Sequence, residues 1–506
     1  MPATAPAARS LVSIMQDDNQ LVYGTTQQRQ VALDRMNALG VEAIRVTMFW
    51  KAVAPRSDSR RKPRRFNGAN PRHYPDYLWD RYDELVTMAQ QRGIAVYMNP
   101  TGGGPRWAHR KTRDKSYQRS YRPRPSEYEK FVTAAGRRYS GSYRDENNGG
   151  AVLPRVKWWA IWNEPNQPGW LTPQGQKKRG VGMIPMSPHL YRELLVAGMK
   201  GLRASGHRRD RVLIAELAPL GNEKPDGLRA SLRPGLFLRE MFCLNRKLRR
   251  FTGRGAEARG CGKLDRLRIL KRFPKLGFAH HPYTKKRSPR RRERGRDALT
   301  MANIRSLPRT LDTIARRTRL LPRKIPIWLT EYGYETNPPD PYSGVSLEQQ
   351  AEYINVGDYI AWKHPRIFSN AQFQLYDVPP LFAHPADSRR HWFTYQSGLF
   401  TDERNPQPKP SKDAYEFPLV VTRKRSTARI WGQVRFAQNG TSYPVLLQER
   451  AAGSGTWVNA GKLVQVKQKR GYFRARRPTG RGSTWRAVWA SPDFRRFEVS
   501  REATVR

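Results

Sequence analysis

Two glutamates follow apolar segments and have the side chain that acid–base and nucleophilic chemistry requires. Glu164 lies in the segment Trp-Asn-Glu-Pro-Asn (162–166), and Glu331 lies in Thr-Glu-Tyr-Gly (330–333), 167 residues later. A carboxylate at the end of a buried strand is costly to desolvate, so such a group usually has a chemical task. Glycoside hydrolysis needs two carboxyl groups, one to protonate the leaving oxygen and one to attack the sugar or activate water. We therefore predict that Glu164 and Glu331 form a catalytic pair.

Short apolar segments alternate with amphipathic helical stretches between about residues 11 and 400, which is typical of repeated βα units. The eight expected strands are 11–15, 41–50, 94–100, 156–166, 212–219, 276–284, 325–336 and 371–377. Segments that are apolar throughout indicate parallel strands covered by helices on both faces. The sequence therefore predicts an α/β fold, a (β/α)8 TIM barrel. Both glutamates then follow strands at the C-terminal face, where barrels carry their chemistry.

The last part of the chain has a different pattern. After residue 417 the helical signals disappear, and short β-rich segments separated by turn residues follow. We predict an N-terminal tail over residues 1–9, a catalytic barrel domain over 10–417 and a small all-β sandwich domain over 418–506. The sandwich has three alternative roles at this point: structural capping, glycan binding, or attachment to an anionic cell surface.

With these residues in place, the chain resembles the clan A retaining glycoside hydrolases, the (β/α)8 group with cellulase-like and β-xylosidase-like members. The resemblance covers roughly residues 10–417. It implies that Glu164 is the general acid/base and that Glu331 is the nucleophile. The C-terminal part is similar to the β-sandwich modules of bacterial secreted glycosidases, of an actinobacterial type. No metal and no organic cofactor is implied.

The resemblance also implies a set of substrate-binding residues. Arg45 matches the arginine that supports the nucleophile, and Asn163 matches the residue that binds the sugar 2-hydroxyl. In the segment 281–283, His281 and Tyr283 match a His-x-Tyr pair that contacts both carboxylates. Many members have a tryptophan at the end of strand eight, and here Tyr376 is expected to replace it.

Simpler interpretations of some of these residues remain open. Arg45 is also a plausible structural ion-pair partner, and His281 a plausible core histidine. If the catalytic interpretation holds, Arg45 and the Tyr283 hydroxyl are expected to keep the pKa of Glu331 low. Trp107 and Trp170 are expected to be exposed in loops, where they would stack on sugar rings.

The two cysteines, Cys243 and Cys261, form no CxxC motif and have no histidine cluster nearby, so we predict no metal site. Their residues alone leave open a disulfide or two free buried thiols. The resemblance implies export, and hence a Cys243–Cys261 disulfide and an extracellular or cell-surface location. Residues 1–10 lack the pattern of a secretory signal. No transmembrane segment is expected, because no apolar run is long enough.

The charge balance is unusual. The chain has 94 Lys and Arg residues against 42 Asp and Glu residues, which leaves a net charge of +52. Such a field attracts polyanions, although a genome-wide preference for arginine explains the excess equally well. The basic segment 284–297 is either a solvated loop or a polyanion contact.

Two alternatives to a hydrolase follow from this charge. The first is a catalytically retired barrel that binds an anionic polymer, the cell wall or a surface glycan. The second is a nucleic-acid-binding protein, but nucleic acid is not expected as a specific partner, because no recognition motif is present. The expected partner of the catalytic site is a carbohydrate with β-linked sugars.

Overall fold

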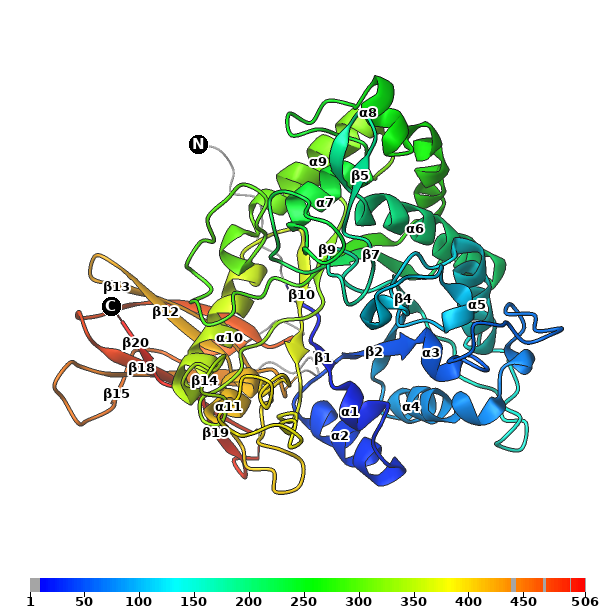
Figure 1. The fold of residues 1–506 in the computed structure, drawn as a ribbon. Helices are drawn as coiled ribbons and strands as arrows, with labels where there is room; N and C mark the ends of the chain where they lie inside the picture. The colour runs from blue at the N-terminus through cyan, green and yellow to red at the C-terminus, as the bar shows by residue number, and fades with distance from the viewer. Residues whose placement is uncertain (1–9, 438–442, 467–469, 492, 506) are drawn as a thin grey trace.

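The computed structural model describes residues 10–437, 443–466, 470–491 and 493–505 (Figure 1). The tail expected over residues 1–9 lies outside them. The largest sheet has nine parallel segments in the order β10-β9-β8-β7-β4-β3-β2-β1-β11. Their bounds are β1 (Ile14–Gln16), β2 (Ala43–Phe49), β3 (Ala95–Thr101), β4 (Trp158–Ile161), β7 (Arg211–Leu217), β8 (Leu276–His280), β9 (Ile327–Leu329), β10 (Ile367–Asn370) and β11 (Gln372–Phe373).

The sheet closes on itself through its last two segments. Only Ala371 separates β10 from β11, so together they form one interrupted strand. β10 pairs with β9, and β11 pairs with β1, both in parallel. The nine segments are thus the eight strands of a closed barrel, which confirms the predicted TIM barrel.

Helices surround the barrel sheet (Figure 1). They are α1 (Asp18–Leu21), α2 (Thr26–Ala38), α3 (Trp50–Val53), α4 (Asp80–Gln91), α5 (Pro125–Arg138), α6 (Ser187–Ala204), α7 (Pro234–Met241), α8 (Gly253–Ala258), α9 (Ser306–Thr318), α10 (Leu347–Trp362) and α11 (Pro410–Glu416). In α4 the buried Tyr82, Leu85 and Ala89 share one face at helical spacing. Capping boxes begin α2 at Thr25 and α10 at Ser346.

Large side chains fill the inside of the barrel. Trp158 of β4 and Trp328 of β9 meet edge to face with their ring centroids 4.9 Å apart. The guanidinium of Arg211 lies 4.5 Å and 4.6 Å from the two ring centroids. Tyr97 packs against Trp158 from β3. Because the interior is packed, the barrel is not a pore, and polar chemistry is confined to the end of the strands.

The eighth strand begins earlier than the apolar pattern predicts. We expected residues 371–377, but β10 and β11 together span 367–373. Two polar residues inside the strand, Ser369 and Asn370, interrupt the apolar pattern by which a strand is recognised in the sequence. Ser369 Oγ donates to the Leu329 carbonyl at 3.0 Å, and Asn370 Nδ2 donates to the Asp358 carboxylate at 2.9 Å. These tertiary partners satisfy polar groups that the sequence pattern alone assigns to a loop.

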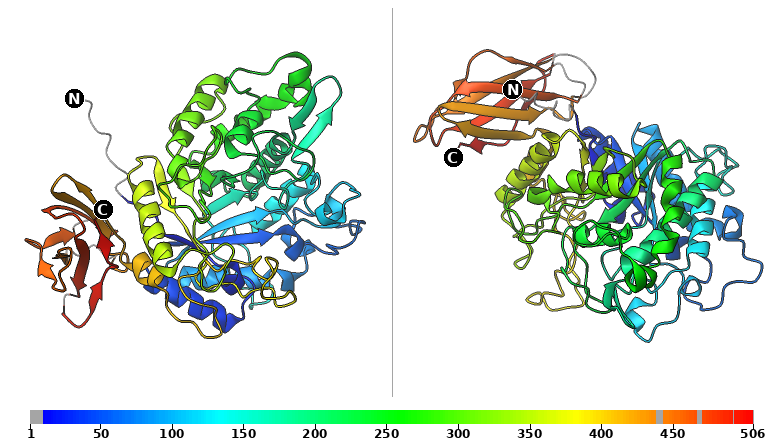
Figure 2. Two further views of the ribbon diagram at one scale, coloured as in Figure 1. Left: turned by 60° about the vertical axis from the view of Figure 1, so that its left-hand side comes forward. Right: turned by 90° about the horizontal axis from the view of Figure 1, so that it is seen from above.

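Antiparallel strands form the C-terminal part, as expected for an all-β domain (Figure 2). One sheet has the order β12-β13-β17, and the other contains β15-β14-β18-β19 with β16 and β20 attached. The bounds are β12 (Leu419–Lys424), β13 (Thr427–Gln433), β14 (Tyr443–Arg450), β15 (Val458–Asn459), β16 (Val464–Val466), β17 (Tyr472–Pro478), β18 (Thr484–Ala490), β19 (Phe497–Val499) and β20 (Ala503–Thr504). Trp485 and Trp489 are buried in its core.

The all-β domain packs tightly against α10 of the barrel. Trp431 and Tyr472 both lie against Trp362, with ring centroids 5.7 Å and 6.3 Å away. The buried Arg435 donates to the Asp358 carboxylate at 2.8 Å. A buried ion pair and aromatic packing between two parts of a chain hold them in one fixed arrangement. The boundary expected at residues 417 and 418 stays a prediction.

A disulfide joins Cys243 and Cys261, which confirms the expected pairing. It links the turn after α7 to the beginning of a 3-10 helix, Cys261–Arg272, so it lies on the outside of the barrel. The β5 (Gly175–Lys178) and β6 (Gly182–Pro185) strands form a separate hairpin after β4. Among the described residues, no helix is long and apolar enough to cross a membrane.

Candidate active site

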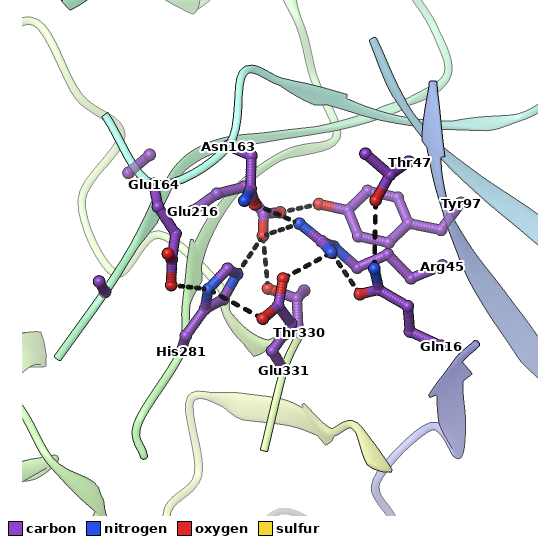
Figure 3. A network of polar contacts seen from close by, with 12 residues as sticks. Gln16, Arg45, Thr47, Tyr97, Asn163, Glu164, Glu216, His281, Thr330 and Glu331 are labelled. Carbon is purple, nitrogen blue, oxygen red and sulfur yellow. Dashed lines mark hydrogen bonds and ion pairs between the residues drawn. The ribbon is translucent and has the colours of Figure 1, made fainter. Parts of the chain in front are cut away.

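The polar residues at the C-terminal end of the barrel form one connected network (Figure 3). Arg45 lies within β2 and is completely buried. Its Nη1 donates to Glu331 Oε1 at 2.7 Å, and its Nη2 donates to Asn163 Oδ1 at 2.6 Å. Arg45 also donates to Gln16 of β1. The structure thus brings the expected arginine, asparagine and nucleophile together, and the rigid strand β2 fixes the direction of the guanidinium.

His281 lies between the two expected catalytic carboxylates. Its Nδ1 is 2.8 Å from Glu164 Oε1 and 3.5 Å from Glu331 Oε2. Tyr283, two residues later, donates its hydroxyl to Glu331 Oε2 at 3.2 Å. Glu331 therefore has contacts from β2 and from the segment after β8. This arrangement orients one carboxylate towards the barrel axis from two sides.

A third glutamate, Glu216 of β7, lies beneath the pair and was not expected from the sequence. Its Oε2 is 2.7 Å from His281 Nε2 and 3.1 Å from Arg45 Nη2. Thr330 donates to the same oxygen at 2.7 Å, and Tyr97 donates to Oε1. Glu216 is completely buried. It therefore contacts both positive groups, Arg45 and His281, that contact the expected catalytic carboxylates.

Both ring nitrogens of His281 face carboxylate oxygens, which determines its charge. Burial opposes the positive form, but the carboxylates of Glu331, Glu164 and Glu216 raise the pKa of His281 to about 9. Burial likewise opposes the ionised form of Glu216, but Arg45 and His281 lower its pKa to about 2. At neutral pH the two groups form a buried ion pair of imidazolium and carboxylate.

The expectation of a low pKa for Glu331 is wrong. Burial raises the pKa of Glu331 above its ordinary value, and the positive charges of His281 and Arg45 only partly oppose that shift. The nearby carboxylates of Glu164 and Glu216 add to the increase. The sequence argument counted the positive neighbours of Glu331 but not the third glutamate or the depth of burial.

Arg45, His281 and the three glutamates together carry no net charge when one of the three carboxyl groups is protonated. Arg45 and His281 supply two positive charges, and Glu164, Glu216 and Glu331 supply three negative charges if all are ionised. One added proton on a carboxyl group makes the network neutral. Electroneutrality in a buried site thus favours a state with one neutral and two ionised carboxyl groups.

The backbone at Glu164 and at Glu216 is held in an uncommon conformation. Trp162 and Glu164 have φ angles of 68° and 35°, in the left-handed region that residues with a side chain seldom adopt. Glu216 has a φ of 46°, where the pairing between β7 and β8 is irregular. The Glu164 amide donates to the Glu216 carbonyl at 2.9 Å. Such conformations persist where the surrounding structure fixes them, and they are frequent at functional sites.

The aromatic residues near the cluster differ from those expected. Tyr376 lies past the strand, where its hydroxyl accepts from Arg35 at 2.7 Å. Its ring packs against Phe400 and does not join the network among the described residues. The eighth strand ends at Phe373, so Phe373 and not Tyr376 is the aromatic residue at the end of that strand. Phe373 packs edge to face against Tyr283 and Tyr395.

Tyr395 belongs to the long segment after β11 and is 53 % exposed. Its ring lies edge to face on Phe373, with the centroids 5.1 Å apart, and burial together with the negative charges of Glu164 and Glu331 raises the pKa of its phenol. Of the two tryptophans expected to be exposed, Trp107 is buried against Trp50 and Phe66, so that expectation is wrong. Trp170 is half-buried and stacks on Phe49.

Glu164, His281 and Glu331 also form a group whose potential metal-ligand atoms all lie within 4.8 Å of one another. His281 already has a carboxylate at each ring nitrogen. Imidazole binds a metal through an unprotonated nitrogen, and the pKa of about 9 leaves none free at neutral pH. The arrangement is better suited to holding protons than to holding a cation, and the absence of a cofactor stays a prediction.

No family model and no curated protein matches this chain. Among solved structures, it is similar to a family 39 glycoside hydrolase from Bacteroides cellulosilyticus WH2, with 12 % identity over 93 % of this chain and 81 % of the other and a TM-score of 0.49. A GH5_18 protein from Streptomyces cattleya, in complex with GlcNAc, has 15 % identity over 81 % and 79 % of the two chains and a TM-score of 0.46. A family 1 β-glucosidase from Thermotoga maritima has 12 % identity over 77 % and 85 %, and a TM-score of 0.45.

Proposed function

We propose that this protein is a retaining glycoside hydrolase that cleaves a β-linked glycan or glycoside by double displacement. The observation that carries the proposal is the spacing of Glu164 and Glu331, whose carboxylate oxygens approach within 4.8 Å. Retaining enzymes hold their two carboxyl groups about 5–5.5 Å apart, whereas inverting enzymes need about 6.5–9.5 Å to admit a water molecule. The short spacing supports direct attack on the sugar by one carboxylate.

The contacts of the two carboxyl groups support distinct roles for them. Glu331 accepts from Arg45 and Tyr283, which direct its lone pairs. The positive charges of Arg45 and His281 favour its ionised form and oppose the increase of its pKa by burial. Its oxygen attacks the anomeric carbon while the bond from that carbon to the leaving oxygen breaks. Glu164 gives its proton to the leaving oxygen. In the second step Glu164 takes a proton from water, and the water oxygen displaces Glu331 from the sugar.

The charged groups of the network already lie in contact with the two carboxyl groups that we propose to react. His281 donates to Glu164 when that group is ionised between the two steps, and Arg45 stays against Glu331. Asn163 is held by Arg45, next to Glu164 in the chain, where its amide is expected to bind the sugar 2-hydroxyl. Such fixed dipoles and charges stabilise the transition state because they need no reorganisation during the reaction.

The alternative is a catalytically retired barrel that only binds an anionic polymer or a surface glycan. The intact pair and the oriented network favour hydrolysis, because a binding protein has no need for two buried carboxylates beside a third that is partly buried. We further propose that the protein works outside the cytoplasm, at the cell surface or beyond it. The Cys243–Cys261 disulfide supports this location, since disulfides persist in oxidising compartments.

The deciding experiment measures the release of reducing ends and of aryl aglycones from a panel of neutral and acidic β-glycans and β-glycosides. Wild type is compared with Glu331→Gln, and proton NMR follows the anomeric configuration of the first product. Retained configuration with wild type, and no release with the variant, supports the proposal. Inverted configuration, or binding without any turnover across the panel, contradicts it.

A further inference from the structure

Three connections at the catalytic face of the barrel domain carry a large excess of positive charge. The loops after β2, β3 and β8, residues 50–79, 102–124 and 281–305, contain 25 Lys and Arg residues but only 5 Asp and Glu residues. We call these three segments the basic rim. The seven α-helices of eight or more residues around the barrel contain 13 basic and 12 acidic residues. The segment 242–275, between α7 and β8, has 12 basic and 2 acidic residues, so composition alone does not single out the rim. What distinguishes the rim is its position beside the two carboxylates.

Most basic side chains of the rim have no acidic partner. Only Lys62, Arg119 and Arg287 of the rim form an ion pair with a carboxylate in the described part of the chain. The exposed arginines at 290, 291, 292, 294 and 296 follow one another within a single loop. Like charges so close together repel one another and destabilise the loop in the absence of an anion. The missing negative charge therefore points to a ligand.

The rim adjoins the proposed catalytic pair. The loop after β8 begins with His281 and Tyr283, which contact Glu331 and Glu164. Farther along the same loop, the Arg287 carbonyl accepts from the hydroxyl of Tyr334, three residues after Glu331. Across the barrel, the loops after β2 and β3 are joined by Arg119 and Asp58. Basic groups thus flank the carboxylates from two sides of the barrel.

We propose that the basic rim binds a polyanionic glycan, so that the hydrolase acts on a polysaccharide that carries carboxylate or sulfate groups. This inference rests on the proposed function. Of the 25 basic residues 19 are arginines, whose planar guanidinium binds carboxylate and sulfate oxygens in pairs. A linear acidic polymer places charges on both sides of the bond being cleaved, and the rim matches that pattern.

Nucleic acid is the competing polyanion, and the rim suits it less well. Binding of single strands relies on aromatic side chains on which the bases stack. Tyr77 is the one large hydrophobic residue of the rim that is strongly exposed in the described structure. The carboxylate pair at the centre is also suited to acetal chemistry and has no role for a phosphodiester. Preferential binding of RNA is therefore an outcome that the test must be able to detect.

The test uses Glu331→Gln as the parent, so that binding is measured without turnover. The rim variant adds Arg290→Ser, Arg291→Ser and Arg292→Ser. A matched control adds Arg309→Ser, Arg316→Ser and Arg317→Ser instead, which removes the same charge from exposed positions of α9. Affinity is measured by titration with polygalacturonate, chondroitin sulfate, neutral xylan and a mixed-sequence RNA, each at 50 and 200 mM salt.

We expect the rim variant to lose at least 10-fold in affinity for an acidic polysaccharide, with a smaller dependence on salt, and the control to change less than 2-fold. Counterion release makes such binding steeply salt-dependent, and each lost contact lowers that dependence. Equal losses in both variants, tighter binding of xylan, or tighter binding of RNA would overturn the inference.

The wild-type enzyme separates this outcome from failure of the proposed function. Acidic-glycan binding that is lost in the rim variant, with no hydrolysis of any glycan by wild type, contradicts the hydrolase but supports the rim as a binding site. Hydrolysis of neutral glycans alone, insensitive to salt, supports the hydrolase and overturns the inference. Hydrolysis of acidic glycans that slows as salt rises supports both.

Discussion

The network at the barrel end and the basic rim differ in how their charged groups are paired. In the network, Arg45 and His281 each contact carboxylates at 2.7–3.1 Å, and every group is buried or nearly so. In the rim, most basic groups are exposed and lack a carboxylate partner among the described residues. Paired charges fix geometry, whereas unpaired charges attract a ligand. The difference is the reason why we propose chemistry for the network and substrate selection for the rim.

The largest expected effect comes from removing the attacking carboxylate. Glu331→Gln keeps the shape and the contact to Arg45 but lacks the nucleophilic oxygen anion. Loss of a covalent nucleophile is expected to lower kcat/KM by at least ~10³-fold. Turnover of the best substrate is measured beside the circular dichroism spectrum and the melting temperature. A folded variant with full activity contradicts the assignment of Glu331.

Removing the proton donor is expected to have an effect that depends on the leaving group. Glu164→Ala should slow the hydrolysis of substrates with poor leaving groups by about 10²–10⁴-fold, the usual contribution of general acid catalysis. Aryl glycosides with acidic phenols need no proton in the first step and should be spared there. Azide should then restore the second step and yield the β-glycosyl azide. Equal losses for all leaving groups would assign Glu164 a different role.

Glu216 connects the two positive groups of the network, so its charge should affect the pH profile. Glu216→Gln removes a carboxylate that helps to raise the pKa of His281 to about 9. His281 should then lose its proton at lower pH. We expect the alkaline limb of kcat/KM to move to lower pH, and the maximum to fall by about 10-fold to 100-fold, as for other misplaced catalytic groups.

A matched variant separates the charge of Glu216 from its packing. Tyr97→Phe deletes one hydrogen bond to Glu216 but no charge. It should lower activity without a comparable movement of the alkaline limb. The pH dependence of stability should move in the same direction as the alkaline limb. A histidine whose pKa is raised on folding stabilises the protein at pH values below the pKa of the unfolded state. That contribution is lost as pH rises through about 9. An unchanged profile in Glu216→Gln would mean that Glu216 has only a structural role.

The sequence predicts the barrel and most of the network for one physical reason. Arg45, Glu164, His281 and Glu331 lie in or directly after apolar segments, where a polar residue conflicts with its surroundings. Glu216 carries the same signal in the apolar segment 212–219, but the resemblance to glycoside hydrolases does not include it. The pattern of strands thus contained one more site residue than the resemblance did.

Other features depend on contacts that no local pattern contains. The eighth strand was misplaced because the polar residues Ser369 and Asn370 are satisfied by distant partners. Tyr395 lies against Phe373, near the proposed catalytic carboxylates, although it belongs to the middle of a 36-residue segment after β11. Tyr376 was assigned to the site only because the strand was expected to extend four residues farther. Loop positions of this kind require the three-dimensional structure.

The smallest expected effect is the response of the network to salt. Its ion pairs are buried, and buried charges are screened much less than exposed ones. Hydrolysis of a small neutral aryl glycoside, which reaches the network but offers no charge to the rim, should change less than about 2-fold between 50 and 500 mM salt. The KM for an acidic polysaccharide should increase steeply over the same range, with kcat nearly constant. If hydrolysis of the small glycoside depends on salt as strongly as hydrolysis of the polymer, the proposed separation of catalysis in the network from substrate selection in the rim is wrong.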